Sequence, residues 1–289
     1  MKKQIITSVN LHLTKSCNMK CKYCFAGFNN TKKLYPFEET IQLMKKLRVF
    51  GFEKINFVGG EPMLIPRISE LLKISKKLGF YTSLVTNGSL LSADFLKETY
   101  KSIDVIGLSI DSLCKETNLS IGRMTSKGIM HINEYSKIVN LINFYGIDLK
   151  INTVVSNINK NEELYSFINK VNPVRWKIFQ VLKIENENDY NFNKFEISDI
   201  EFENFWNKQI SNLNNKKILI KENNEILRGS YLMINPEGCF FDNTKGKYTV
   251  SEKIIKVGVC NALEQINYDY TKYISRSGNY FNKNNNTAA

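Results

Sequence analysis

The residues best suited to chemistry are three cysteines in one short segment. Cys17, Cys21 and Cys24 lie within eight residues, spaced C-x3-C-x2-C, and Tyr23 stands directly before the third. Cysteine thiolates are the usual ligands of iron–sulfur clusters. Three close ligands leave one iron of a four-iron cluster open, and an open coordination position is where a catalytic metal site binds another molecule. The spacing is therefore typical of a catalytic cluster.

A zinc site, or three unrelated core cysteines, would also fit the bare spacing. Zinc prefers four nitrogen or sulfur ligands, and His12, in a strand-like run, is too far back to be an easy fourth ligand. The other cysteines are scattered, at Cys114, Cys239 and Cys260. They form no disulfide framework, so we expect a cytoplasmic protein in a reducing environment.

A second group of candidates consists of polar and cationic side chains on strand-like runs. Alternate side chains of a strand point to opposite faces. On two neighbouring runs the polar face carries Lys150 and Asn152, and then Arg175 and Lys177. Burying such cations together without partners is costly. Either acidic residues pair with them, or an anionic ligand does, or these strands are partly exposed and the charges are solvated.

The elements that must position these residues alternate between strand-like and helix-like to about residue 210. We expect six strands, at residues 9–13, 54–58, 82–86, 104–110, 148–155 and 175–182. Helix-like patterns lie between them and at 198–210, where Ser198 and Glu201 form a capping-box pattern. Six β/α units argue for a parallel sheet with crossover helices. Six are too few for a closed eight-stranded barrel, so we predict an α/β fold, a partial (β/α)6 barrel.

In such sheets, functional sites gather at the carboxyl ends of the strands. The cysteine segment follows the first expected strand directly. The later strands end at Gly59-Gly60-Glu61-Pro62, Asn87-Gly88 and Ser109-Ile110-Asp111. We therefore expect these four segments to share one mouth of the barrel.

After about residue 213 the alternation stops. Residues 218–221 and 231–234 resemble short strands, and Asn235-Pro236-Glu237-Gly238 is a strong turn signal, so 231–241 is a candidate hairpin. We divide the chain into a core at 1–212, a C-terminal extension at 213–281 and an Asn-rich tail at 282–289, which we expect to be disordered.

Composition sets wider limits. The chain of 289 residues is 43% hydrophobic, which suits one large domain or a domain with an appendage. It has no long apolar run for a membrane span and no signal-peptide pattern at its start. Its net charge of +12 fits either solvated lysines or a site for polyanions, namely nucleic acid or a nucleoside triphosphate.

Taken together, the cysteine motif with Tyr23 and the Gly-Gly-Glu-Pro element resemble the radical S-adenosylmethionine (SAM) superfamily. Within it, the chain resembles the viperins in order from about residue 8 to 280. The resemblance is carried by Ser8–Thr14, Lys54–Pro62, Asn87–Leu90, Ile121–Arg123, Lys150–Asn152, Asn172–Lys177 and Ser230–Leu232.

The resemblance implies two cofactors, a [4Fe-4S] cluster on Cys17, Cys21 and Cys24 and SAM on its open iron. In the family, the reduced cluster splits SAM to give a 5′-deoxyadenosyl radical. The matching positions for SAM contacts, with Tyr23 near the adenine, are Tyr23, Gly59, Gly60, Glu61, Asn87, Ser109 and Arg123.

The resemblance also implies a nucleotide dehydratase that converts CTP, UTP or GTP into the 3′-deoxy-3′,4′-didehydro analogue, a chain terminator in antiviral defence. Tyr231 matches a candidate proton or hydrogen donor, and the C-terminal extension is expected to close the nucleotide site. An external electron donor and a monomer are expected. The positions that match the triphosphate site are Lys150, Asn152, Arg175, Lys177, Lys247 and Arg276.

Animal viperins also have an N-terminal amphipathic helix and an acidic tail, which this sequence lacks, so we expect a microbial type with no membrane attachment. One alternative is a radical SAM enzyme acting on a peptide or another small molecule, although only Cys239 and Cys260 are available for a further C-terminal cluster. Another is a metal-stabilised nucleic-acid-binding protein, which would leave the Gly-Gly-Glu-Pro element and the cysteine spacing unexplained. We therefore expect no nucleic-acid partner.

Overall fold

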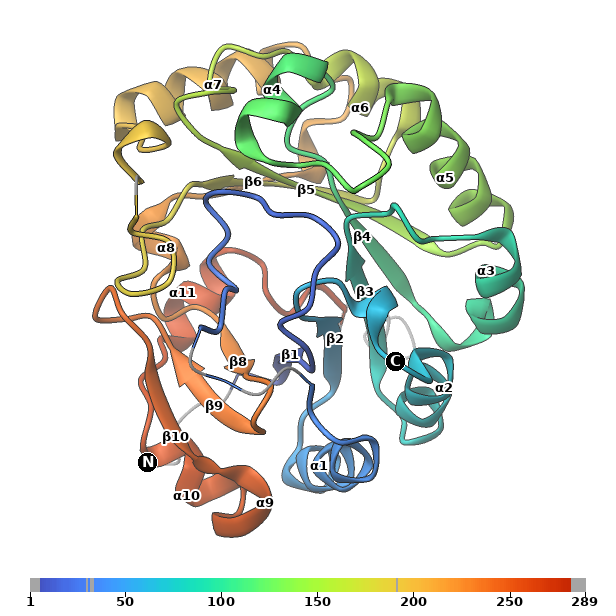
Figure 1. Ribbon diagram of the computed structural model, residues 1–289, viewed down its shortest axis with the longest axis vertical. Coiled ribbons are helices and arrows are strands. Elements are labelled where there is room, and N and C mark those ends of the chain that lie inside the picture. Colours follow the sequence, from blue (N-terminus) through green and yellow to red (C-terminus); the bar gives the residue numbers. More distant parts are fainter. Residues whose placement is uncertain (1–5, 30, 32–33, 191, 282–289) are drawn as a thin grey trace, which may run out of the picture.

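The computed structural model describes residues 6–29, 31, 34–190 and 192–281. Within these residues one sheet of ten strands has the order β10-β9-β8-β1-β2-β3-β4-β5-β6-β7, and it curves into an open, barrel-like arc (Figure 1). The strands are β1 (Ser8–His12), β2 (Lys54–Val58), β3 (Tyr81–Thr86), β4 (Val105–Ser109), β5 (Asp148–Val155), β6 (Arg175–Gln180), β7 (Leu219–Glu222), β8 (Leu232–Ile234), β9 (Cys239–Asp242) and β10 (Thr249–Lys253).

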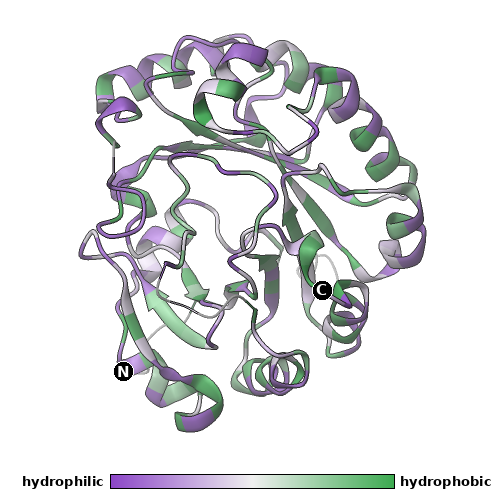
Figure 2. Ribbon diagram, viewed as in Figure 1, coloured by the Kyte–Doolittle hydropathy of each residue, from purple (hydrophilic) through white to green (hydrophobic). Residues whose placement is uncertain are grey.

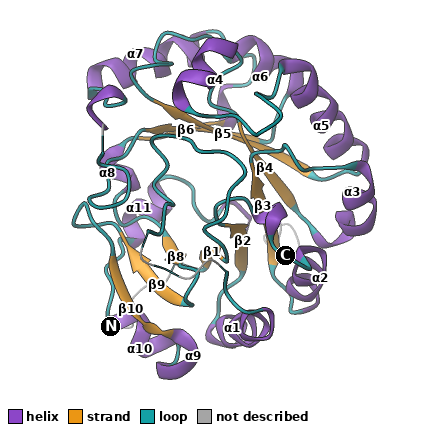
Figure 3. Cartoon of the chain, viewed as in Figure 1, coloured by secondary structure: helices purple, strands orange, loops and turns teal. Residues whose placement is uncertain are grey.

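Most helices follow the outer side of the arc, while loops cross its interior (Figure 3). The α-helices are α1 (Phe37–Phe50), α2 (Ile68–Lys77), α3 (Ala93–Thr99), α4 (Lys115–Ile121), α5 (Ile132–Phe144), α6 (Tyr165–Val171), α7 (Asp199–Ser211), α8 (Asn224–Leu227), α9 (Ile254–Val257), α10 (Val259–Glu264) and α11 (Tyr270–Ser275). Short 3-10 helices cover Pro62–Leu64, Tyr100–Ser102, Phe192–Lys194 and Lys216–Ile218.

Local sequence signals explain several helix ends. The predicted capping box is present at α7, where the Ser198 hydroxyl accepts from the Glu201 N–H and Glu201 reaches back to the Ser198 N–H. Helix α1 has acidic residues in its first turn and ends at Gly51, whose φ of 116° is a left-handed conformation that suits glycine.

The predicted parallel core is confirmed. Strands β1 to β6 lie in sequence order and pair in parallel. The predicted hairpin is also present, since β8 pairs antiparallel with β9. The extension forms no separate sheet, because β7 adds in parallel to β6 and β8 adds in parallel to β1. Both additions continue the barrel-like arc.

Two local features differ from the predicted elements. Helix α4 was not predicted, and α6 begins at Tyr165, whereas the sequence pattern predicts a helix over 161–170. The reason for the second difference is Asn159, whose side-chain amide donates to the carbonyl oxygens of Asp111 at 2.8 Å and Val154 at 2.9 Å. This asparagine holds the segment after β5 as a turn.

The apolar faces of the strands pack under the helices. Val9, Leu11, Ile151 and Trp176 are all 0% exposed, and Figure 2 shows strongly hydrophobic stretches along the sheet beneath more hydrophilic outer helices. The opposite faces of β5 and β6 carry Lys150 and Arg175 toward the interior, as the alternation predicted. In the described residues we find no helix of the length and apolar character that a membrane span requires. The expected tail at 282–289 lies outside the described residues.

Candidate active site

The four segments expected at one mouth of the barrel do meet there. The loop after β2 is laid against the start of the cysteine segment, because the Gly60 N–H donates to the Thr14 carbonyl at 2.7 Å and the Glu61 N–H to the Ser16 carbonyl at 2.8 Å. A Cβ atom at Gly60 would lie 2.2 Å from the Ser16 carbonyl oxygen. Only glycine allows this close approach of the two backbones.

A second glycine clamps the other side of the cysteine segment. Gly122 ends α4 with a φ of +74°, and a Cβ atom there would lie 2.3 Å from the Lys20 carbonyl oxygen. Next to it, the Lys22 N–H donates to the Ile121 carbonyl at 2.9 Å. The three cysteines are therefore presented by a segment that is held at both flanks.

The thiols have surroundings that fit a cluster. Cys17 and Cys24 are exposed and Cys21 is half-buried, and the Met19 N–H points at the Cys17 sulfur at 3.4 Å. Burial raises the pKa of Cys21 to about 11, so metal loading must release its proton. N–H donors aimed at the sulfurs are a recognised means of tuning iron–sulfur clusters.

The arrangement does not favour a single zinc ion. In the described parts of the chain, no group of three or more His, Cys, Asp or Glu side chains could hold one metal ion. His12 is buried and packs edge-on against the rings of Phe28 and Phe241, and burial lowers its pKa to about 3. Because aromatic rings enclose this imidazole, His12 is not placed to supply the fourth ligand that zinc prefers.

Glu61 ties the mouth together from within. It is 1% exposed, and its carboxylate accepts hydrogen bonds from the N–H groups of Met63 at 3.1 Å and Asn87 at 2.8 Å and from the Thr86 hydroxyl at 2.6 Å. Burial nevertheless raises its pKa. The carboxylate thus fixes the end of β3 beside the Gly-Gly-Glu-Pro loop.

Asn87 continues this network to the cysteine segment. Its side-chain amide donates to Asn18 Oδ1 at 2.9 Å and lies 4.0 Å from the Cys17 sulfur. The side-chain Oδ1 of Asn87 accepts from the Ser89 N–H at 2.9 Å and from the Ser89 hydroxyl at 2.6 Å. Asn87 is therefore placed directly beside the cysteine segment.

Arg123 is anchored by an acid that the list of predicted site residues omitted. Its Nη1 donates to Asp111 Oδ2 at 2.7 Å and lies 3.9 Å from the Cys21 sulfur, and its Nη2 donates to the Ser109 carbonyl. Arg123 and Asp111 are both buried. The signal for Asp111 was its position just after β4, at the predicted mouth.

Tyr23 lies inside the protein beneath this mouth. It is 6% exposed, its hydroxyl donates to Asp111 Oδ2 at 2.7 Å and its carbonyl accepts from the Asn188 amide at 2.9 Å. Its ring meets Phe195 edge-on. Tyr23 therefore supports the Asp111–Arg123 pair, and the adenine contact stays a prediction.

Deeper in the barrel lies a group of cationic side chains that we term the interior cationic cluster. Its members are each at most 8% exposed and interact electrostatically: Lys54, Lys150, Arg175, Lys177 and Arg276. Gly107 leaves the space for one of them, because a Cβ atom there would lie 2.8 Å from Lys150 Cε. Lys54, the first residue of β2, was not predicted as a site residue. The strand alternation could have indicated it, since Lys54 and Asn56 lie on the same polar face.

The cluster contains one carboxylate with described contacts, Glu222 at the end of β7, which was not predicted either. It is 0% exposed and forms ion pairs with Lys177 and, at 3.8 Å, with Arg276. Tyr231 donates its hydroxyl hydrogen to Glu222 and accepts from Lys177 Nζ at 2.7 Å. Within the described part of the chain, Glu222 is therefore the one carboxylate that forms an ion pair with this cluster. No salt bridge to Lys54, Lys150 or Arg175 occurs within the described residues.

The positive charge of the cluster lowers the pKa values of its lysines. Burial and the neighbouring Arg175 lower the pKa of Lys150 to about 8. Burial and the other cations hold the pKa of Lys54 well below its usual value. A bound polyanion would reverse both effects, because an opposite charge favours the charged form.

The C-terminal segment covers the cluster on the side where strands β2 and β6 begin. Arg175 Nη2 donates to the carbonyl oxygens of Arg276 at 2.7 Å and Ser277 at 3.1 Å. The Tyr280 ring lies 4.5 Å from the Arg175 guanidinium and 4.0 Å from the Lys54 ammonium. Residues beyond 213 therefore help to build this site.

Two predicted substrate contacts are placed differently from the rest. Asn152 lies beside Lys177 in the β5–β6 register, and its Oδ1 atom is buried without a hydrogen-bond partner. Lys247 is exposed in the turn between β9 and β10, and no described contact joins it to the cluster. The clamp role of Lys247 stays a prediction.

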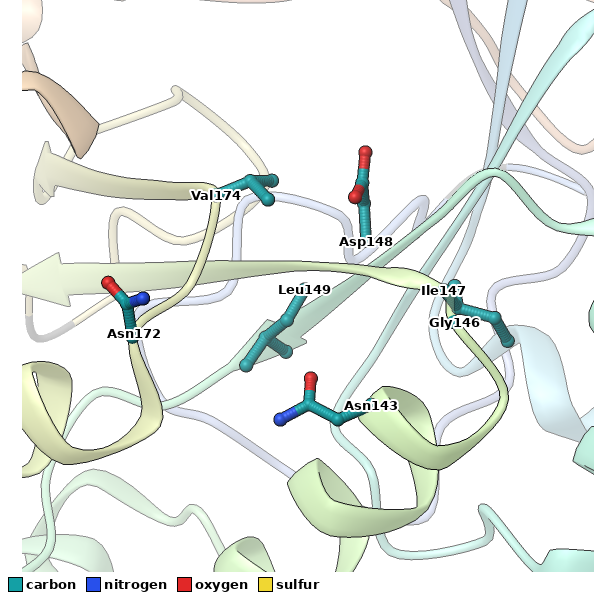
Figure 4. A pocket seen from close by; sticks show the side chains of 7 residues that line it. All are labelled: Asn143, Gly146, Ile147, Asp148, Leu149, Asn172 and Val174. Carbon is teal, nitrogen blue, oxygen red and sulfur yellow. The ribbon is translucent and has the colours of Figure 1, made fainter.

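A surface pocket of about 230 Å³ lies at the amino end of β5 (Figure 4). Its lining contains none of the predicted site residues and consists of Asn143, Gly146, Ile147, Asp148, Leu149, Asn172 and Val174. We assign it no role in the active site.

Comparison with known proteins places the chain in a family. The model of the radical SAM superfamily matches residues 11–171. An S-adenosylmethionine-dependent nucleotide dehydratase from Flammeovirga pacifica is 44% identical over 96% of both chains. The protein of that name from Lacinutrix mariniflava is 43% identical over 97% of this chain, which spans only 60% of that longer protein. The one named RSAD2 from Danio rerio is 34% identical over 95% of this chain and 77% of its own.

The chain belongs to the viperin family of the radical SAM superfamily. Members of this superfamily use a [4Fe-4S] cluster and SAM. The three cysteines of the segment that Gly60 and Gly122 hold in place fit such a cluster. Solved structures support the fold. Streptococcus suis SuiB bound to S-adenosylmethionine has a TM-score of 0.64 at 16% identity, covering 81% of this chain and 59% of SuiB. Native anSMEcpe with bound AdoMet has a TM-score of 0.68 at 17% identity, covering 93% and 82%.

Proposed function

We propose that this chain is a SAM-dependent nucleotide dehydratase that converts CTP, UTP or GTP into its 3′-deoxy-3′,4′-didehydro analogue for antiviral defence. The single observation that carries the proposal is the interior cationic cluster, whose five buried cations have one ion-paired carboxylate, Glu222, among the described residues. Arg and Lys are the expected partners of phosphate groups, and the names of the relatives support a nucleotide as the substrate.

Cys17, Cys21 and Cys24 would hold the cluster in this proposal, with Gly59, Gly60, Glu61, Asn87, Ser109, Arg123 and Tyr23 forming the SAM site around it. When bound, these cofactors supply the 5′-deoxyadenosyl radical that takes the ribose 4′ hydrogen. The chain keeps the SAM site rigid, because Asp111 fixes Arg123 and three hydrogen bonds fix Glu61. The electrons come from an external donor.

The barrel interior would bind and orient the triphosphate. Among the described residues, Lys54, Lys150 and Arg175 have no acidic ion-pair partner and would form the main phosphate site, while Lys177 and Arg276 contact Tyr231. Asn152 would offer its unpaired oxygen to a substrate donor, and residues 213–281 close the site. Tyr231 would deliver a proton as the 3′ hydroxyl leaves, since its oxygen lies within this cluster. Enclosure excludes water from the radical.

The proposal is tested anaerobically. The reconstituted protein is mixed with dithionite, SAM and CTP, UTP or GTP separately, and products are analysed by mass spectrometry. We expect 5′-deoxyadenosine to form with one nucleotide, which loses the mass of water. If 5′-deoxyadenosine forms while every nucleotide is unchanged, the substrate assignment is wrong and a peptide or another small molecule takes its place.

We further propose that the chain works in the cytoplasm as a monomer. The absence of a membrane-spanning helix from the described residues is compatible with this location. Sedimentation of the purified protein tests the oligomeric state, and fractionation of the producing cells tests the location.

A further inference from the structure

Glu222 has a set of contacts that phosphate binding does not require. Its carboxylate reduces the positive charge available to a polyanion, and yet it is fully buried between Lys177, Arg276 and Tyr231. Burying a carboxylate is costly unless it is paired and hydrogen-bonded. The contacts of Glu222 point to what this pairing achieves.

The hydrogen bonds around Tyr231 run in one direction. A phenol has one hydrogen, and Tyr231 donates it to Glu222 Oε2 while its oxygen accepts from Lys177 Nζ at 2.7 Å. The ammonium of Lys177 also pairs with Glu222 Oε1. The Arg276 guanidinium, 3.7 Å from the centre of the Tyr231 ring, fixes the ring plane. Lys177 is therefore aligned to replace a hydrogen that Tyr231 gives away.

We propose that Glu222 is a positioning residue that aligns Lys177 and Tyr231 as a proton relay to the leaving 3′ hydroxyl. This inference rests on the proposed function. The Tyr231 hydroxyl turns from Glu222 Oε2 to the 3′ hydroxyl, and its hydrogen moves to the hydroxyl oxygen as the C3′–O bond breaks, so that water leaves. A Lys177 hydrogen then moves to the phenolate, which restores the phenol and leaves a neutral amine. One proton is consumed, Glu222 stays ionised, and the electron that completes the double bond comes from the external donor.

The charge of Lys177 depends on Glu222. Burial and neighbouring cations lower the pKa of Lys177, and the carboxylate of Glu222 opposes this effect. Without that carboxylate the pKa falls further, and the ammonium is lost at a lower pH. The groups that face Lys177 are Glu222 on β7, Tyr231 before β8, Arg276 after α11, Lys150 on β5, Arg175 on β6 and Lys54 on β2.

The first test measures protons taken up when CTP binds. Calorimetry at about pH 8 in buffers of different ionisation enthalpy, without SAM or reductant, compares the wild type with Glu222→Gln. We expect the variant to take up more protons per CTP than the wild type, because the pKa of Lys177 is lower without the carboxylate and a larger share of its amine must be charged on binding. Glu203→Gln, which breaks the exposed 2.6 Å pair with Lys221, is the matched control. Equal uptake in all three proteins would overturn the proposal, whatever their enzymatic activity.

The second test uses the loaded enzyme. Glu222→Gln should give roughly tenfold less dehydrated product per 5′-deoxyadenosine, and the alkaline limb of its pH profile should move to lower pH. If Glu222→Gln does not fold, Tyr231→Phe replaces it, because this variant keeps the ring beside Arg276 and loses only the hydroxyl. The same ratio of dehydrated product to 5′-deoxyadenosine is then measured. An unchanged product ratio and pH profile contradict the relay. If the wild type binds CTP with the expected uptake but dehydrates no nucleotide, the proposed function fails while the Glu222–Lys177 pairing stands.

Discussion

The mouth of the barrel and its interior are charged in different ways. At the mouth, Arg123 is paired with Asp111 and the carboxylate of Glu61 accepts three hydrogen bonds. In the interior, the described residues give the five buried cations one ion-pair partner, Glu222, which pairs with Lys177 and Arg276. Buried charges are stable when they are paired. The charges at the mouth are paired within the protein, whereas we propose that an anion pairs with those of the interior. This contrast predicts that substitutions at the mouth affect cofactor loading, while those in the interior affect nucleotide binding.

The largest expected effect is at the mouth. Cys21→Ala removes one of three thiolates, and we expect loss of iron binding and of SAM cleavage, with CTP binding kept because the interior cluster is intact. Iron analysis, 5′-deoxyadenosine assay and calorimetry with CTP measure the three properties. Cys260→Ala, at an exposed position far along the chain, is the control. SAM cleavage that persists in Cys21→Ala would exclude the cluster assignment.

The next effect concerns the interior. Lys150→Met keeps the length of the side chain and removes its charge, and we expect CTP binding to weaken roughly 10- to 100-fold, as for loss of a charged hydrogen bond. Slow SAM cleavage without nucleotide should be unchanged, because the mouth is untouched. Equal CTP affinity in the variant and the wild type would show that the cations are structural.

A glycine pair tests the rigidity of the mouth. Gly122→Ala places a methyl group 2.3 Å from the Lys20 carbonyl oxygen, whereas Gly146, with a similar φ of +67°, has nothing within 4 Å of its Cβ position. Both alanine variants therefore place a side chain at a positive φ, but only Gly122→Ala also brings a methyl group against a backbone oxygen. We expect Gly122→Ala to be about 2 kcal/mol less stable than Gly146→Ala and to retain less iron. Denaturant unfolding measures the stability of the two variants, and iron analysis measures their metal content. Equal stability would show that the close contact between Gly122 and Lys20 does not hold the cysteine segment.

These contrasts also show which features the sequence could reveal. The cysteine spacing and the strand alternation depend on neighbours in the chain, so the mouth and the cationic face of β5 and β6 were predictable. Glu222 was not, because its partners Lys177 and Arg276 are 45 and 54 positions away and meet it only when β7 joins β6. Asp111 was seen at the mouth, but its pairing with Arg123 depends on the turn after α4. The placement of strands β7 and β8 at the two sides of the core likewise required the folded sheet.

A smaller effect is expected from pH. Lys150 has a pKa lowered to about 8, so above that pH binding of a triphosphate must first restore its proton. Affinity for CTP should fall about tenfold between pH 7 and pH 9. Stability without nucleotide should change the opposite way and rise over the same range, because the unfolded chain, with an ordinary lysine pKa, binds more protons there. Calorimetry and thermal unfolding at each pH measure both, and Lys150→Met should flatten both dependences. Affinity and stability that move together would contradict this account.

The smallest effect is expected outside both regions, at Lys247. Its side chain is exposed in the β9–β10 turn, where water screens its charge, and exposed charges contribute little to a site that they do not contact. Lys247→Ala should therefore change CTP affinity less than about twofold, while Arg276→Ala, which removes a buried cation from beside Tyr231, should weaken it at least roughly tenfold. The same calorimetric titration compares them. A large loss in Lys247→Ala would mean that the turn folds over the bound triphosphate, so that the interior is completed by the chain as well as by the anion.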